Sequence, residues 1–270
     1  MKCAIRVPPN VEARTNLDRE QYCDKGQIGT YNGVYPDGSK SYGGYADYAR
    51  VPSHFVIKIP ENLPSEIAAP MLCGGVTVYD PIKANGAGPG KTVGIVGVGG
   101  LGHFGLIFAK ALGAEVVAIS HNESKKADAE KMGAKGFIAT GKGKSVFKEH
   151  VRTLDFIVCT VNSPDMPILG YLSMLKVGGK LILVGAPELP LPQLPVFPFI
   201  LNNVFLGGSA IGSPERIAEM LQLASKQDLK GWVQMRPMSD VNQAVRDMEA
   251  GKARYRYCLV NEKNVKELGQ

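Results

Sequence analysis

No apolar stretch in this sequence reaches the ~18–20 residues that a membrane-spanning helix requires. The longest runs are short, as in Phe156–Val161 and Leu181–Val184. No apolar segment of the kind found in secretory signals follows Met1. The five cysteines are odd in number and widely spaced, which is not the pattern of a disulfide framework. We therefore expect a cytoplasmic protein without a membrane partner.

Positive charge is present but not concentrated. The formal net charge is +6, yet lysine and arginine are scattered along the chain. Nucleic-acid binders usually gather such charge in a stripe with interleaved aromatics, so no nucleic-acid partner is expected. The densest cluster, Lys125 to Lys131, alternates with acids. It is either the solvated face of a helix or a site for a small phosphorylated ligand.

Apolar runs predict the elements. Residues 23–60 are rich in turn formers and predict short strands, among them Tyr45–Val51 and Phe55–Pro60. A helical pattern opens near Leu63. From residue 91 strands and helices alternate, which predicts βαβ units and a parallel sheet with helices on both faces. The expected strands are 92–96, 115–119, 136–138, 156–159, 180–184, 205–211 and 255–260. The expected helices are 101–112, 125–132 and 214–225. Residues 187–198 are rich in proline and predict a stiff loop.

The most informative motif is G-x-G-x-x-G at Gly97, Gly99 and Gly102, between an expected strand and an expected helix. The first glycine permits the tight turn, the second lets the backbone approach a pyrophosphate, and the third allows close packing of helix on strand. The helix N-terminus favours a diphosphate. The sequence therefore predicts a dinucleotide-binding Rossmann domain.

The residues after the second strand favour NADP over NAD. An acidic residue at this place would hydrogen-bond the ribose 2′-hydroxyl of NAD. Here the segment begins Ser120-His121-Asn122, and Glu123 is expected to lie past the contact point. Ser120 can donate to a phosphate oxygen and Lys125 can neutralise it. The alternative roles for these two residues are a helix cap and a surface lysine.

Several separate segments resemble the cinnamyl-alcohol-dehydrogenase branch of the zinc-type medium-chain dehydrogenases. They are Val96–His103, Leu72–Tyr79, Tyr22–Lys25 with Gly43–Ala46, Gly207–Ser213 and Ala253–Tyr257. The resemblance covers about residues 20 to 262 and implies NADP(H) as cofactor. It also implies a GroES-like catalytic domain split by a Rossmann domain. The fold class expected is therefore α/β, a doubly wound parallel Rossmann sheet with an incomplete GroES-like β-rich domain.

The resemblance places the domain boundaries and the cofactor residues. We expect a remnant of the GroES-like domain at 1–75, the NADP-binding domain at 76–225, and a return to the catalytic domain at 226–270. The residues expected at the cofactor are Gly97, Gly99, Gly100, Leu101, Gly102, Ser120, His121, Lys125, Gly185, Ser209 and Ile211. His103 follows the last glycine of the motif and is expected to be a surface histidine.

The zinc sites of the family are not matched. The resemblance implies catalytic zinc on a Cys, on a His from a His-Glu pair and on a second Cys, but only Cys73 is present and no His-Glu dipeptide occurs. A catalytic zinc needs three protein ligands, so Cys73 is a ligand only if a zinc site survives. Of the structural zinc pattern only Cys23 is matched; Thr15, Glu12 and Pro9 stand at the other three positions. We expect an N-terminally truncated member with its zinc chemistry lost.

Hydride transfer without zinc needs another group to hold oxyanion charge or to donate a proton. Tyr79 and Cys73, and less directly Tyr48, are candidates, with packing as the alternative role for each. One reading is an NADP(H)-dependent reductase of a C=O or activated C=C in a small apolar molecule. Others are a non-redox or non-catalytic cofactor-binding pseudoenzyme, or a fragment of a zinc alcohol dehydrogenase. The family joins Rossmann sheets edge to edge, so Phe205–Ile211 predicts a homodimer.

Overall fold

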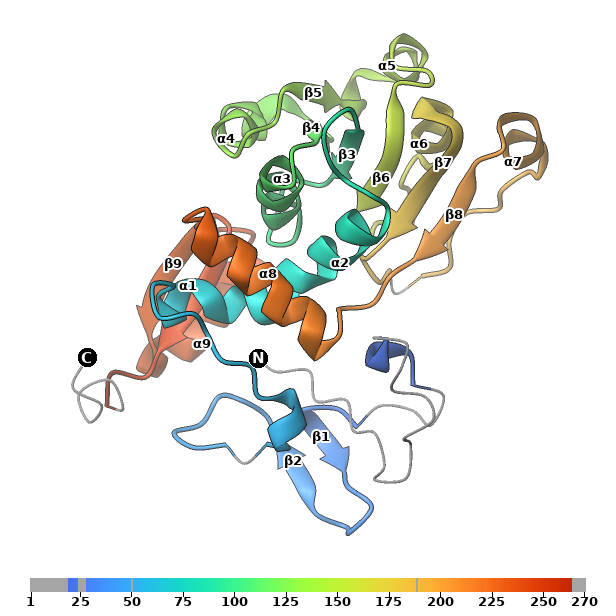
Figure 1. Ribbon diagram of the computed structural model, residues 1–270. Helices are drawn as coiled ribbons and strands as arrows, with labels where there is room; N and C mark the ends of the chain where they lie inside the picture. Colours follow the sequence, from blue (N-terminus) through green and yellow to red (C-terminus); the bar gives the residue numbers. More distant parts are fainter. Residues whose placement is uncertain (1–18, 24–27, 50, 188, 264–270) are drawn as a thin grey trace. The chain divides into compact units, whose positions relative to one another are not determined.

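The computed structural model describes residues 19–23, 28–49, 51–187 and 189–263 (Figure 1). Pro9, Glu12 and Thr15, which the resemblance sets at three positions of the structural zinc pattern, lie outside the described residues. The chain divides into two compact units. The second unit is Thr77–Ser209, and the first unit combines the chain up to Val76 with the chain from Ala210 onward. Within the described part, no helix is both long and apolar enough to cross a bilayer.

The second unit is built on a six-stranded parallel sheet. Its order is β5-β4-β3-β6-β7-β8. The strands are β3 (Thr92–Val96), β4 (Glu115–Ser120), β5 (Gly136–Ala139), β6 (Leu154–Cys159), β7 (Leu175–Leu183) and β8 (Phe205–Gly208). The apolar runs of the sequence therefore form the expected parallel sheet. Buried runs of this kind are typical of parallel strands, which are covered on both faces.

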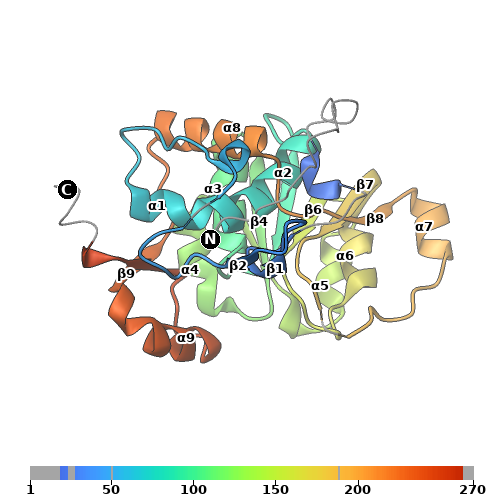
Figure 2. The ribbon, with the colours of Figure 1, turned by 90° about the horizontal axis from the view of Figure 1, so that it is seen from below.

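Helices connect these strands. They are α3 (Gly102–Ala111), η5 (Glu123–Lys125), α4 (Lys126–Lys131), η6 (Thr140–Lys142), α5 (Ser145–Glu149), α6 (Ile168–Met174) and α7 (Phe197–Asn202). The chain runs outward from β3 to β5, crosses back to β6, and continues in the opposite direction. Because parallel crossovers are right-handed, this reversal places α3 and α4 on one face and α5 and α6 on the other (Figure 2). The reversal point, between β3 and β6, is where such sheets bind ligands.

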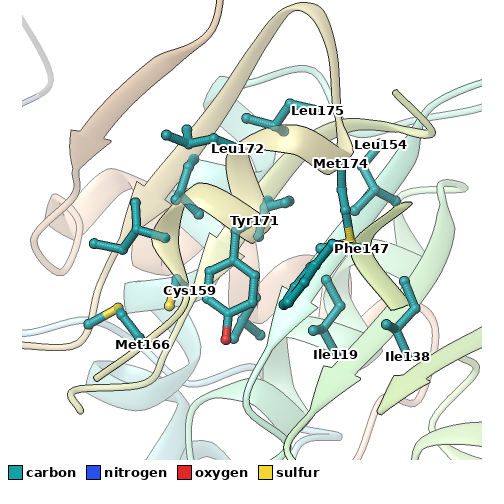
Figure 3. Packing of buried hydrophobic residues seen from close by; sticks show 14 of the residues in the cluster. Ile119, Ile138, Phe147, Leu154, Cys159, Met166, Tyr171, Leu172, Met174 and Leu175 are labelled. Atoms are coloured by element: carbon teal, nitrogen blue, oxygen red, sulfur yellow. The ribbon is translucent and has the colours of Figure 1, made fainter. Parts of the chain in front are cut away.

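The core beneath α5 and α6 is continuous and apolar. Ile119 and Ile138, from β4 and β5, contribute to it together with Phe147 of α5 and Tyr171 of α6 (Figure 3). The Phe147 and Tyr171 rings meet edge to face, with centroids 6.1 Å apart. Burial raises the pKa of the Cys159 thiol, at the end of β6, to about 11. Cys159 therefore remains a neutral packing residue at neutral pH.

The first unit holds shorter elements. Its strands are the antiparallel pair β1 (Tyr31–Val34) and β2 (Lys40–Tyr42), and the parallel pair β9 (Val233–Pro237) and β10 (Arg256–Val260). Its helical segments are η2 (Glu20–Tyr22), η3 (Ser53–Phe55), α1 (Ser65–Pro70), the π-helical turn η4 (Met71–Gly75), α8 (Pro214–Lys226), η7 (Met238–Asp240) and α9 (Val241–Glu249). Helix α2 (Val76–Ala84) begins at the boundary and continues into the second unit.

Three expectations differ from the structure. Tyr45–Val51 and Phe55–Pro60 form no strand among their described residues; the hairpin lies earlier, around the turn at Tyr35. Alternation predicts a strand only where a neighbouring strand pairs with it, and the Tyr45 and Tyr48 side chains are exposed.

The expected end of the NADP-binding domain at residue 225 also differs from the division of the structure. Helix α8 belongs to the first unit, where Ser225 and Asn62 share two hydrogen bonds.

An ionic cluster joins three strands at the amino end of the sheet. The Asp155 carboxylate, on β6, accepts the Thr92 backbone N–H of β3 at 2.9 Å and the Lys176 ammonium of β7 at 2.7 Å. Lys91 lies 3.2 Å from the same carboxylate. Burial pushes the pKa of Asp155 upward, but Lys176, the Thr92 N–H and Lys91 outweigh it, so the pKa is lowered. This cluster therefore holds the amino ends of the strands together, at the end of the sheet opposite to the glycine motif.

We expect Asp155→Asn to lower the free energy of unfolding by about 1–3 kcal/mol at pH 7, because charged hydrogen bonds are lost. The native pKa lies below the reference value of 3.8. The stabilisation is therefore complete well above pH 4 and is lost as the pH falls through the native pKa. Urea unfolding of both proteins between pH 7 and pH 3 measures this. A difference between them that does not shrink toward pH 3 would contradict the assignment.

Candidate functional site

The glycine motif forms a tight turn between β3 and α3. Gly97 has φ +89°, and a Cβ there would lie 2.7 Å from Thr160 Oγ1. A Cβ on Gly102 would lie 1.6 Å from the Gly97 carbonyl oxygen, so only glycine permits this approach of helix to strand. A Cβ on Gly99 would meet nothing within 4 Å. Gly97 and Gly102 thus leave no room for a side chain, whereas the backbone at Gly99 faces open space, as binding of a phosphate requires.

The first turn of the helix completes the cradle. Gly100 and Leu101 are half-buried and lie between the open Gly99 and the helix start. His103 is fully buried, which corrects the expectation of a surface histidine. Its Nδ1 lies 3.2 Å from the Gly99 carbonyl oxygen, and its ring lies against Phe104 with centroids 4.0 Å apart. His103 therefore holds the backbone of the glycine loop in place through its contact with Gly99.

The carboxyl end of β6 forms the other side of the reversal point. The Thr160 hydroxyl donates to the Val96 carbonyl at 2.8 Å, which ties the ends of β6 and β3 together. A Cβ on Gly185 would lie 2.6 Å from the Val161 carbonyl oxygen, so this expected cofactor residue is a close-approach glycine at the same edge. Sequence reasoning missed Thr160 and Val161. Their signal, the two residues after an expected strand, becomes informative only once the strand order is known.

The loop after β4 brings a lysine to the glycine motif. Lys125 Nζ donates to the Val98 carbonyl at 2.7 Å across 27 residues of sequence. Ser120 is half-buried at the carboxyl end of β4, and His121 next to it is exposed. The side chain of Asn122 caps the turn by accepting the Ser124 N–H at 3.0 Å. The structure therefore places Ser120 and Lys125 at the same edge of the sheet as the cradle.

The remaining expected residues divide between the units. Ser209 closes the second unit, where its N–H donates to the Leu183 carbonyl at 3.0 Å. Ile211 belongs to the first unit and has φ +35°. The Tyr79 ring is 1% exposed in the second unit and meets Phe108 edge to face at 5.4 Å. These contacts are those of a packing residue.

Cys73 lies in the first unit, on the π-helical turn η4. A Cβ on the adjacent Gly74 would lie 2.8 Å from Arg256 Nη2, so the guanidinium rests against this turn. Burial lowers the pKa of Arg256, and the charge of Cys73 acts in the opposite direction. Arg256 was missed as a site residue because only the packing of β10 against this part of the chain reveals it. A half-buried cation beside a thiol can hold negative charge.

Among the described residues, no group of three or more His, Cys, Asp and Glu side chains could hold a metal ion. His54 instead pairs with Glu20, with Nε2 2.8 Å from Oε1. Tyr48, the third candidate for catalysis, is exposed on the first unit.

Comparison with known proteins gives concordant matches. The family model described as "Zinc-binding dehydrogenase" matches residues 100–226. NADP-dependent alcohol dehydrogenase 6 of Saccharomyces cerevisiae is 44% identical over 250 residues, which cover 92% of this chain and 69% of the relative. The 8-hydroxygeraniol dehydrogenase of Catharanthus roseus is 46% identical over 244 residues, covering 90% and 67%.

Solved structures agree. The cinnamyl alcohol dehydrogenase SbCAD4 from Sorghum bicolor matches with a TM-score of 0.87 at 34% identity, covering 94% of this chain and 72% of that one. The CAD from Helicobacter pylori, complexed with NADP(H), matches with a TM-score of 0.84 at 33% identity, covering 95% and 73%.

Two glycines of the motif should respond differently to alanine. Gly102→Ala places a Cβ against the Gly97 carbonyl and should lower the free energy of unfolding by about 1–3 kcal/mol. Gly99→Ala occupies open space and should change it by less than about 0.5 kcal/mol, while weakening dinucleotide binding. Urea unfolding and fluorescence titration measure the two effects. Equal destabilisation by both variants would rule out this assignment of roles.

Proposed function

The chain belongs to the zinc-binding dehydrogenase family, and we propose that it is an NADP(H)-dependent oxidoreductase of the alcohol dehydrogenase type. The observation that carries the proposal is the contact of Lys125 Nζ with the Val98 carbonyl, which sets a cation beside the glycine loop. The relative in S. cerevisiae is named NADP-dependent, and the H. pylori structure is titled as an NADP(H) complex.

All but one of the proposed cofactor residues belong to the second unit; Ile211 belongs to the first. Gly99 and Gly100, with the helix start, would receive the pyrophosphate, because their backbone is open to a ligand. Ser120 and Lys125 would hold the 2′-phosphate by hydrogen bond and by charge. Gly185 lets the chain after β7 lie against the backbone of Val161 after β6, where a Cβ would not fit. His121, Ser209 and Ile211 remain proposed cofactor contacts.

We propose that the reaction reduces a C=O or an activated C=C of a small apolar molecule without zinc. The bound cofactor supplies a hydride. The chain must then stabilise developing negative charge and deliver a proton to oxygen or carbon. Cys73 beside Arg256 is the candidate for the first task, since a guanidinium stabilises an adjacent anion. Tyr79 stays the candidate proton donor, although its contacts are those of packing.

Binding of the two nicotinamide cofactors tests the proposal first. We expect NADPH to bind more tightly than NADH. Lys125→Ala should lower the affinity for NADPH roughly tenfold and change the affinity for NADH little, because one charge-assisted contact with the 2′-phosphate is lost. Nicotinamide fluorescence measures both affinities. The control is Lys131→Ala, which removes the same charge from the last turn of α4. Equal affinity of the wild-type protein for NADPH and NADH would overturn the NADP(H) assignment.

Turnover tests the reaction. We expect NADPH oxidation with a panel of aldehydes and enones, and no loss of rate with a zinc chelator. Inhibition by the chelator that zinc restores would contradict the zinc-free proposal. Cofactor binding without any turnover would favour the non-catalytic, cofactor-binding alternative.

We further propose a homodimer formed through the sheet edge. Strand β8 ends the sheet, and beside it several large apolar side chains are exposed. These are Val196, Phe197, Ile200, Leu201 and Phe205. An apolar patch at an unpaired strand edge favours association with a second sheet.

Ile200→Asp should convert the dimer to a monomer, because a charge would be buried in the proposed interface. Sedimentation velocity at micromolar concentration measures the change. Val34→Asp, which alters a comparably exposed valine on β1 of the first unit, should leave the dimer intact. A wild-type protein that is monomeric at this concentration would contradict the proposal.

A further inference from the structure

Three consecutive residues of the turn η6 bind the loop that follows β4. The Thr140 hydroxyl donates to the Ser120 carbonyl at 3.2 Å, and the Gly141 N–H donates to the His121 carbonyl at 2.7 Å. Lys142 Nζ then donates to the carboxylate of Glu123. The turn after β5 is therefore fastened along the segment that begins with Ser120.

This close approach depends on Gly141. A Cβ at that position would lie 2.5 Å from the His121 carbonyl oxygen and 3.2 Å from the His121 ring. Backbone cannot yield as a flexible side chain can, so a larger residue would push the two loops apart. Glycine at 141 thus brings Lys142 to the β4–α4 loop.

The ion pair neutralises the one acid of this segment. Between Ser120 and Lys126 the only acidic residue is Glu123. The hydrogen bond from Lys142 and its charge lower the pKa of Glu123, desolvation opposes them, and the charge of Lys126 also lowers this pKa. Glu123 therefore stays ionised at neutral pH, and its charge is balanced from the next loop along the sheet.

We propose that Lys142 is a specificity-determining residue for NADP(H): by holding the Glu123 carboxylate, it removes the repulsion that this acid would exert on a 2′-phosphate at Ser120 and Lys125. The inference rests on the proposed cofactor site. Lys142 acts through Glu123 and is therefore a positioning residue. An unpaired carboxylate in this loop would instead favour a cofactor with a free 2′-hydroxyl.

The chain contains a matched ion pair at the other end of the same strand. Lys142 and Glu123 have side chains 63% and 55% exposed, and Lys135 and Glu115 have side chains 62% and 55% exposed. Glu115 begins β4, whereas Glu123 follows its carboxyl end. Exposed pairs of this kind contribute little to stability, so both should be silent in unfolding experiments. Only the Glu123 pair should affect a ligand at the carboxyl end of β4.

The test is calorimetric titration of the full chain with adenosine 2′,5′-bisphosphate and with 5′-AMP, which differ by the 2′-phosphate alone. We expect Lys142→Gln to lower the affinity for the bisphosphate about fivefold at low salt. The affinity for 5′-AMP should fall by less than about twofold. The double variant Glu123→Gln with Lys142→Gln should return to near the wild-type affinity, because no carboxylate remains to be neutralised. Lys135→Gln should leave both affinities unchanged.

The outcomes separate this inference from the cofactor assignment. A double variant as weak as Lys142→Gln would mean that Lys142 contacts the phosphate itself, which overturns a role through Glu123. An equal loss in Lys135→Gln would reveal a general charge effect and also overturn it. A wild-type protein that prefers the bisphosphate, with no effect of Lys142→Gln, overturns this inference alone. No preference in the wild-type protein overturns both.

Discussion

The contact between Gly102 and the carbonyl oxygen of Gly97 sets the distance between the end of β3 and the start of α3. At this distance a single added carbon would lie 1.6 Å from an oxygen, so the turn can exist only with glycine there. The tight turn places the start of α3 directly after the carboxyl end of β3. Everything proposed for this edge, from phosphate to 2′-phosphate contacts, depends on that geometry.

The order of the strands turns this single motif into a site. Because the chain reverses direction between β3 and β6, the ends of these strands are not covered by a connecting crossover. Thr160 fastens the two ends together, and Lys125 reaches the glycine loop from the neighbouring strand. Asp155 joins the same strands at the opposite edge. The sheet thus has an ionic cluster at its amino end, and Lys125 lies beside the glycine loop at its carboxyl end.

Much of the second unit could be predicted from sequence, and less of the first. Runs such as Thr92–Val96 are buried on both faces, so their composition alone indicates parallel strands. Tyr45–Val51 was a wrong prediction because alternation does not reveal whether a partner strand exists. His103 was wrongly expected at the surface because a polar side chain in the first turn of a helix gives no signal of burial. In both cases burial or strand pairing is a property of the folded chain, which local composition does not reveal.

The sequence by itself determined the α/β class and the glycine motif, and it led to the proposal of Ser120 and Lys125, because each of these depends on residues close together in the chain. The tertiary structure decided which strand ends meet, that Thr160 and Arg256 join the candidate residues, and that Lys142 pairs with Glu123. These contacts join segments that are distant in the sequence. The contact of Lys142 with Glu123 also needs the space that Gly141 leaves open, and neither feature can be read from local composition.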